Sequence, residues 1–365
     1  MIKLNLNNLL LAGLCSLLFS GCFVQKDDDT IKIGVVLGLS GKYSTLGVDE
    51  KNGIVLAFNQ IDYRVNKKKV ELIIKDDKQD TTTNQNAINE LIKNDVKILI
   101  ANATSSMTKV SLDITSKHND VFQISPTASS SQFSNKEDNF FRVQTAYSPK
   151  HFNNLIALIK EHKAQRIFLI GDKNNKTYLN DFLHIFDEDK NIHYEAVIDS
   201  HLSYEEIFKK VKNADFIIQV QNSTDAASLI QYLRIHKNNT PILSSGWAKN
   251  KEFIENSGRW ANGIYFISSD YINNKDENYQ NFANEFYKIY KHKPNSFNIH
   301  GYQAARVIID ALQNGNEKLE DIKNFIIKKE HFNIAGNKLS FNKYGDIKNQ
   351  YYIFEVQNNK FERIK

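Results

Sequence analysis

Short apolar segments with strand character alternate, along most of this chain, with segments whose apolar residues recur at helical spacing. The run 31–37 is followed by Ile54, Phe58 and Ile61 at helical spacing, and the run 166–170 is followed by another helix-type segment. Regular alternation of this kind predicts parallel sheets with helices on both faces, because each parallel connection needs a crossover. We therefore expect an α/β protein.

The alternation divides the chain into two halves, each with enough strands for a sheet of its own. The strand-type runs are 31–37, 70–74, 96–100 and 121–124 in the first half, and 166–170, 193–198, 216–220, 241–243 and 263–267 in the second. Three helix-type stretches at 277–291, 296–313 and 318–328 precede a final segment that alternates like an antiparallel ribbon. A length of 365 residues suits two doubly wound lobes of about 150 residues each.

The composition excludes several other classes of protein. With 41% hydrophobic and 24% charged residues, the chain is neither disordered nor a polytopic membrane protein. Its 47 basic and 42 acidic residues are interleaved, which indicates a solvated surface and not a nucleic-acid-binding stripe. We expect no nucleic-acid partner.

The N-terminal residues are typical of an export signal. The apolar run Leu9–Phe19 is too short to span a bilayer as a helix, and it is followed by Ser-Gly-Cys at 20–22, as in bacterial lipoprotein signals. We expect a signal peptide at 1–21, a lipid on Cys22 and a polar tether at 22–30. A plain signal peptide with an incidental cysteine is the alternative. The lipid anchor would hold the protein at the cell envelope, on the periplasmic or extracellular face of a bacterial membrane.

Two clusters of hydroxyl residues follow neighbouring strand-type runs. One is 102–108, which opens a helix-type segment, and the other is 125–131. Ligands of open α/β sheets lie beyond the carboxyl ends of the strands, and helix N-termini attract anions. Serine and threonine could therefore hold a small carboxylate there. The alternative is that Ser105 and Thr127 only cap helices. The glycine-bearing loop 38–47 lacks the pattern of a phosphate-binding loop.

From Ile31 to the C-terminus the chain resembles the type I periplasmic binding proteins of the leucine/isoleucine/valine-binding kind. The matching segments, in order, are Ile33–Leu37 with Ser40-Gly41, Gly47 and Asn52-Gly53, Asp76-Asp77 with Asp80, Ser105-Ser106, Ile124–Ser129, Phe141–Val143, Gly301–Ala305 and Leu339–Asp346. The resemblance implies two lobes joined by a three-segment hinge. We expect the first lobe at 31–144 and 270–338 and the second at 145–269 and 339–365.

The resemblance also assigns roles to individual residues. In this family the ligand lies between the lobes, and its carboxylate and amine are held by the first lobe. Those roles would fall on Ser105 or Ser106, and on Thr127 and Ser129. Tyr178 occupies the place of a tyrosine that closes over the ligand from the second lobe.

Further residues would line the side-chain pocket. Tyr43 and Leu46 lie in the first loop, where the family places this lining. Trp247 could stack on an apolar part of the ligand, or it could be a partly exposed core residue. Gln219 and Gln221 could donate amide hydrogen bonds, or they could simply be solvated at the end of their strand.

One departure from the amino-acid binders matters more than the others, such as Leu179 in place of a glycine after the tyrosine. These proteins carry an acidic residue after the strand that corresponds to 241–243, and it pairs with the ligand ammonium. Here that loop is Ser244-Ser245-Gly246-Trp247, without a carboxylate. A buried ammonium without a partner is costly. Either Asp225 or Asp270 replaces the missing acid, or the ligand is not an α-amino acid.

We find no pattern that points to an enzyme. The ten histidines include no HExxH motif or close metal pair, and the chain has no GxSxG. We expect no catalytic residue, no cofactor and no metal. The expected function is that of a monomeric solute-binding lipoprotein that delivers a small amino acid or related carboxylate or amide to an ABC permease. The alternatives are a lipoprotein that reports a ligand to a membrane sensor or envelope enzyme, and a degenerate pair of lobes that binds nothing.

Overall fold

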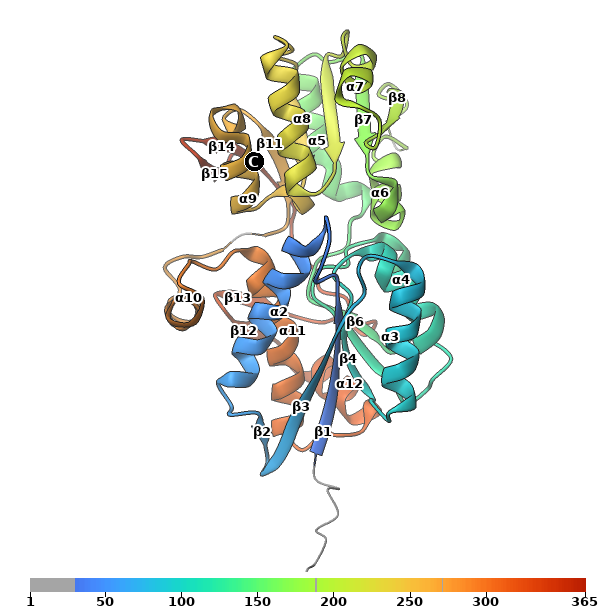
Figure 1. Ribbon diagram of the computed structural model, residues 1–365, viewed down its shortest axis with the longest axis vertical. Coiled ribbons are helices and arrows are strands. Elements are labelled where there is room, and N and C mark those ends of the chain that lie inside the picture. The colour runs from blue at the N-terminus through green and yellow to red at the C-terminus, as the bar shows by residue number, and fades with distance from the viewer. Residues whose placement is uncertain (1–29, 188, 271) are drawn as a thin grey trace, which may run out of the picture.

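Strands and helices alternate through most of the folded chain and form two α/β lobes, one above the other in Figure 1. The computed structural model describes residues 30–187, 189–270 and 272–365. The expected signal peptide, tether and lipidated Cys22 lie outside the described residues, apart from Thr30, which begins the first strand. No helix within those ranges is long and apolar enough to cross a membrane.

The first lobe is built on a six-stranded sheet in the order β2-β3-β1-β4-β5-β6. All neighbouring strands are parallel except β2, which pairs antiparallel with β3. The strands are β1 (Thr30–Leu37), β2 (Arg64–Val65), β3 (Lys68–Asp76), β4 (Ile98–Ala101), β5 (Phe122–Ser125) and β6 (Phe140–Arg142). The central runs are buried along their length, as a sheet covered on both faces requires.

Helices cover both faces of this sheet. They are α2 (Ser44–Asn59), α3 (Thr81–Lys93), α4 (Ser105–Thr115), α10 (Glu277–Tyr290), α11 (Ser296–Gln313) and α12 (Leu319–Lys328). Successive side chains of a strand point to opposite faces, so Val36 joins the apolar cluster of α3 whereas Val35 joins the larger cluster that includes α2 and α11. Alternation within the strands therefore decides which helix each residue contacts.

Two glycines allow α2 and α11 to cross at very short distance. A Cβ atom on Gly53 would lie 1.9 Å from the carbonyl oxygen of Asn298, and a Cβ atom on Gly301 would lie 2.1 Å from the carbonyl oxygen of Glu50. Any larger residue would push the helices apart. This crossing brings the start of α11, from the last third of the chain, against the start of α2.

The second lobe contains a seven-stranded sheet in the order β15-β14-β11-β10-β9-β7-β8. Its strands are β7 (Ile167–Gly171), β8 (Tyr194–Asp199), β9 (Phe216–Val220), β10 (Ile242–Ser245), β11 (Tyr265–Ser268), β14 (Tyr352–Gln357) and β15 (Lys360–Arg363). Its helices are α5 (Asn153–Glu161), α6 (Lys176–Leu183), α7 (Tyr204–Lys210), α8 (Ser223–Ile235) and α9 (Lys251–Ser257). The strands β14 and β15 add to the sheet as an antiparallel ribbon, which confirms the prediction for the C-terminal segment.

Short 3-10 turns complete the two lobes. They are η1 (Ser131–Phe133), η2 (Pro149–Phe152), η3 (Lys173–Asn175), η4 (Gly246–Ala248) and η5 (Gly258–Ala261). The two doubly wound, parallel-dominated sheets confirm the fold class that the sequence predicts.

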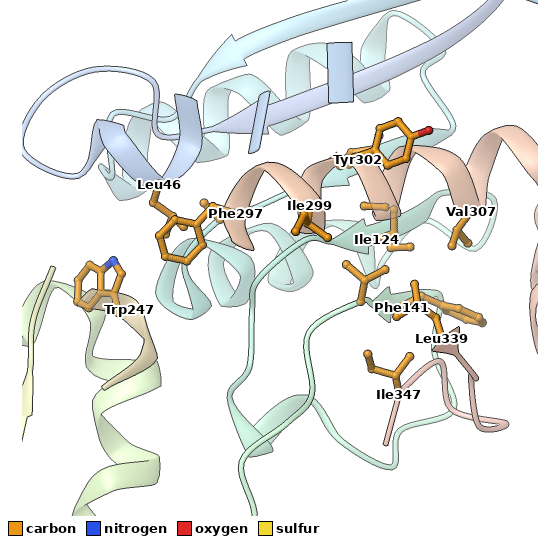
Figure 2. Packing of buried hydrophobic residues seen from close by; sticks show 14 of the residues in the cluster. Leu46, Ile124, Phe141, Trp247, Phe297, Ile299, Tyr302, Val307, Leu339 and Ile347 are labelled. Atoms are coloured by element: carbon orange, nitrogen blue, oxygen red, sulfur yellow. The ribbon is translucent and has the colours of Figure 1, made fainter. Parts of the chain in front are cut away.

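The last crossing between the lobes lies later than the predicted boundary at 338/339. The hairpin of β12 (Phe332–Ile334) and β13 (Asn337–Leu339) precedes it, and residues 341–347 still pack on the first lobe. Figure 2 shows Leu339 and Ile347 beside Phe141. The chain reaches the second sheet only at β14.

A buried ion pair fixes this late segment to the first lobe. Arg142, whose side chain is fully buried, donates to the Asp346 carboxylate from Nε at 2.8 Å and from Nη2 at 2.6 Å. Its Nη1 also donates to the carbonyl oxygens of Ala128, at 3.4 Å, and Ser130, at 2.7 Å. Arg142 therefore holds the loop after β5 on both sides of Ser129.

Candidate functional site

A cavity lies between the two lobes, where the carboxyl ends of both sets of parallel strands face each other, and it offers about 50 Å³ to the centre of a water-sized sphere. The first lobe lines it with the start of α2, the loops after β4 and β5, and the start of α11. The second lobe contributes η3, α6, η4 and the end of β11, and the hinge segments contribute the remaining residues. The lining consists of Leu46, Ala103, Thr104, Ser105, Thr127, Ser129, Gln144, Tyr147, Asn175, Tyr178, Gly246, Trp247, Ser268, Asp270, Phe297 and His300.

The loop after β4 presents the N-terminus of α4 to the cavity. Thr104 is the N-cap, and its hydroxyl accepts a hydrogen bond from the Met107 N–H at 3.4 Å. Ser105 is buried, and its hydroxyl accepts from the Ser130 N–H at 3.2 Å. The Ser105 hydroxyl hydrogen is not engaged in that contact. It can therefore be donated to a ligand oxygen.

The loop after β5 contributes Thr127 and Ser129. Thr127 Oγ1 contacts Glu50 Oε1 and lies 2.6 Å from the carbonyl oxygen of Ala103. Ser129 is buried, and its backbone carbonyl accepts from the Tyr147 N–H at 3.0 Å. These contacts tie the loop to α2, to the loop after β4 and to the first hinge segment, at Tyr147.

Aromatic rings form the wall of the cavity on the side of the second lobe. Trp247 stacks on Tyr43 with ring centroids 5.7 Å apart, and it meets Tyr178 edge-on at 6.2 Å. Tyr178 and Tyr147 share a hydrogen bond of 3.0 Å between their hydroxyl groups. Figure 2 shows Trp247 facing Leu46 and Phe297 across the gap between the lobes. This wall suits an apolar or aromatic part of a small molecule.

The lobes are closed around the cavity through direct polar contacts. The Ser106 N–H donates to Asn175 Oδ1 at 3.1 Å, and the Thr177 N–H donates to the Ser106 hydroxyl at 3.1 Å. The Tyr43 hydroxyl donates to the buried Asp172 carboxylate at 2.8 Å. Each contact joins the first lobe to the second.

Charged residues add further contacts between the lobes. Lys42 forms an ion pair of 2.6 Å with Asp225 across the gap. The Ser131 N–H and hydroxyl both donate to Asp181. Burial raises the pKa of Asp181, although the Ser131 contacts offset part of that shift.

One carboxylate lines the cavity. Asp270 lies just after β11, its side chain is 7% exposed, and its Oδ1 lies 3.3 Å from Nε2 of His300. Burial acts to raise the pKa of Asp270, but His300, the Lys249 ammonium and the Ser268 hydroxyl outweigh it and hold that pKa below its usual value. Asp270 is therefore ionised at neutral pH.

The structure places six of the predicted ligand-binding residues in the cavity lining. They are Leu46, Ser105, Thr127, Ser129, Tyr178 and Trp247. Tyr43 and Ser106 do not line it, because their polar groups bridge the two lobes. Of the two acids proposed in place of the missing carboxylate, Asp270 lines the cavity and Asp225 pairs with Lys42.

Gln221 lies away from the cavity. Its side chain is buried, and neither amide atom has a hydrogen-bond partner among the described residues. The same holds for Gln219. The cavity also contains residues that the sequence did not suggest, chiefly Phe297 and His300 from α11 and Asn175 from η3. No local motif marks them, because their place depends on the crossing of α2 and α11 and on lobe closure.

Within the described ranges, no group of three or more histidine, cysteine, aspartate or glutamate side chains is arranged to hold a metal ion.

Comparison with known proteins agrees with this architecture. Residues 30–182 match the family model described as periplasmic binding protein. A leucine-binding protein from Thermotoga maritima superposes with a TM-score of 0.81 at 21% identity, covering 92% of this chain and 98% of its own. The chain has the fold of the type I periplasmic binding proteins. No curated protein sequence matches it.

Two further solved structures with this fold contain different ligands. A branched-chain amino acid transporter substrate-binding protein from Streptococcus pneumoniae, solved with isoleucine, gives a TM-score of 0.81 at 21% identity over 92% of this chain and 99% of its own. An ABC-transporter solute-binding protein from R. palustris, solved with benzoate, gives a TM-score of 0.81 at 15% identity, over 92% of this chain and 95% of its own. At these identities the likeness establishes the fold and not the ligand.

Proposed function

We propose that this protein is a solute-binding lipoprotein of an ABC transporter that captures a small amino acid, or a related carboxylate or amide, between its lobes. The observation that carries the proposal is the cavity between the lobes, lined by uncharged hydroxyl groups from one lobe and aromatic rings from the other. A concave site that combines an apolar wall with a few polar groups suits a small molecule.

The lining suggests how each part of such a ligand is held. The hydroxyl groups of Ser105 and Ser129, at the start of α4 and after β5, face a ligand carboxylate as donors. The ligand side chain packs between Leu46 and Trp247. Asp270 takes the place of the acid that is missing after β10 and attracts a ligand ammonium.

Capture occurs by hinge closure. Ligand contacts with both lobes favour the closed form, and the polar contacts between the lobes add to that preference. The ABC permease would then recognise the closed form. A ligand-reporting lipoprotein without a permease would use the same closure, so the partner decides between the two roles.

A thermal-shift panel of amino acids, their amides and organic acids tests the proposal. A ligand at about 100 times its dissociation constant stabilises the folded protein by roughly 2.7 kcal/mol, which corresponds to a rise of several degrees in Tm. The methyl ester of each active compound serves as the control, because it removes the carboxylate charge while keeping the side chain. A panel in which no compound raises the Tm contradicts ligand capture.

A further inference from the structure

The hydroxyl group of Thr127 lies between two oxygen acceptors. Its Oγ1 contacts Glu50 Oε1 on one side and is 2.6 Å from the carbonyl oxygen of Ala103 on the other. A hydroxyl has one hydrogen to donate and two lone pairs. It therefore cannot donate to both oxygens, and one of the two contacts needs a hydrogen from elsewhere.

The surroundings of Glu50 point to the source of that hydrogen. The side chain is completely buried on α2, and no Lys, Arg or His among the described residues forms an ion pair with it. Its second oxygen, Oε2, has no hydrogen-bond partner in the described part of the chain. The charged groups that act on it are the acids Asp77 and Asp49. An ionised carboxylate in such a place is strongly disfavoured.

The pKa of Glu50 agrees with this geometry. Burial raises that pKa well above its usual value, the Thr127 contact offsets part of the shift, and repulsion from Asp77 and Asp49 adds to it. The backbone of Glu50 is packed closely at the crossing of α2 and α11, because a Cβ atom on Gly301 would lie 2.1 Å from the Glu50 carbonyl oxygen.

We propose that Glu50 is a protonated positioning residue that turns the Thr127 hydroxyl into a hydrogen-bond acceptor toward the ligand. The Glu50 carboxylic acid donates to Thr127 Oγ1, and Thr127 donates to the carbonyl oxygen of Ala103. Every short contact then contains one hydrogen. The remaining lone pair of Thr127 is left for the cavity that this residue lines.

This arrangement determines which group of the ligand Thr127 can bind. Thr127 has no hydrogen to offer a carboxylate and instead accepts an N–H from an ammonium or amide group. The carboxylate is left to Ser105 and Ser129. This inference rests on the proposed function and deepens it, because it makes the captured solute a nitrogen donor and not a simple organic acid.

Affinity ratios measured by isothermal titration calorimetry test the inference. The probes are pairs that differ only in the amino group: leucine with 4-methylpentanoate, and phenylalanine with 3-phenylpropanoate. In the unmodified protein we expect the amino acid of a bound pair to bind at least tenfold more tightly. Glu50→Gln keeps a neutral donor and should preserve that ratio. Glu50→Leu removes the donor, frees the Thr127 hydroxyl to rotate, and should lower the ratio about tenfold.

Several results would overturn the inference. One is a Glu50→Leu variant that weakens both members of a pair equally, since a purely structural role predicts that pattern. Others are a preference for the deaminated acid in the unmodified protein, and loss of the ratio in Glu50→Gln.

A second measurement requires no ligand, and it does not depend on whether the Glu50→Leu variant folds. The infrared difference spectrum between the unmodified protein and Glu50→Gln at neutral pH should contain the carbonyl band of a protonated carboxylic acid. Absence of that band refutes the protonated Glu50 directly. If no probe binds the unmodified protein, the proposed function fails for these solutes, and the infrared band still decides the state of Glu50.

Discussion

Replacement of Tyr43 by phenylalanine tests whether contacts between the lobes set ligand affinity. The Tyr43 hydroxyl donates to the buried Asp172 at 2.8 Å and accepts from Asn174 Nδ2 at 2.7 Å. Phenylalanine keeps the ring that stacks on Trp247 and removes only these hydrogen bonds. Since Tyr43 belongs to the first lobe and its partners to the second, the loss falls on the closed form.

The expected magnitude follows from the burial of the two partners. A hydrogen bond to a charged group contributes about 1.5–3 kcal/mol. Tyr43 is only half-buried and Asp172 keeps its bond from the Asn174 N–H, at 2.9 Å, so we take the lower end of that range. A loss of about 1.5 kcal/mol from the closed form lowers the apparent affinity roughly tenfold, because only the closed form binds with full strength.

The assay compares dissociation constants from calorimetry with the compactness measured by small-angle X-ray scattering at saturating ligand. Tyr194→Phe is a matched control, because the Tyr194 hydroxyl donates to the Phe182 carbonyl oxygen at 2.7 Å within the second lobe. The control should lower the Tm without changing affinity. A Tyr43→Phe protein that binds as tightly as the unmodified one, while folding normally, would refute the link between these contacts and closure.

Two further changes test the buried charges. Asp346→Ala leaves the fully buried Arg142 without its carboxylate partner. Urea denaturation should show a free energy of unfolding that is lower by about 3–5 kcal/mol. A loss below about 1 kcal/mol would contradict the stabilising role of this ion pair. Glu50→Gln tests the pH dependence of stability. Because the pKa of Glu50 is raised in the folded protein, Glu50 loses its proton at lower pH in the unfolded chain than in the folded one. The unmodified protein therefore loses stability as pH rises above about 4.5. The stability of Glu50→Gln relative to the unmodified protein should therefore increase by up to about 1.4 kcal/mol per pH unit above that value, and a difference that does not vary with pH would exclude a raised pKa.

Much of the fold can be predicted because a strand that is buried on both faces of its sheet appears in the sequence as a short apolar run. The run 216–220 is apolar except for Gln219, and all of its residues are buried in β9. The helix expected at 296–313 has those bounds in α11. The strands Arg64–Val65 and Phe140–Arg142 were not predicted, because two or three residues are too few to show a period.

Part of the candidate site could be predicted because ligand-binding residues of α/β sheets follow the carboxyl ends of parallel strands. Ser105 and Thr127 were predicted because they come after parallel strands, and the structure brings both to one cavity. Gln221 also comes directly after a strand, β9, yet it is buried and does not line the cavity. A position after a strand therefore places a residue at the right edge of the sheet but does not say which way its side chain points.

The sequence by itself determined the alternation of strands and helices, the two lobes and the hydroxyl clusters at the strand ends, because these depend on local period and chain order. Tertiary structure alone decided that Phe297 and His300 enter the cavity, that Asp270 and not Asp225 is its carboxylate, and that Glu50 controls Thr127. These relations arise where segments far apart in the chain meet, at the crossing of Gly53 and Gly301 and across the closed lobes, and no local pattern encodes such a meeting.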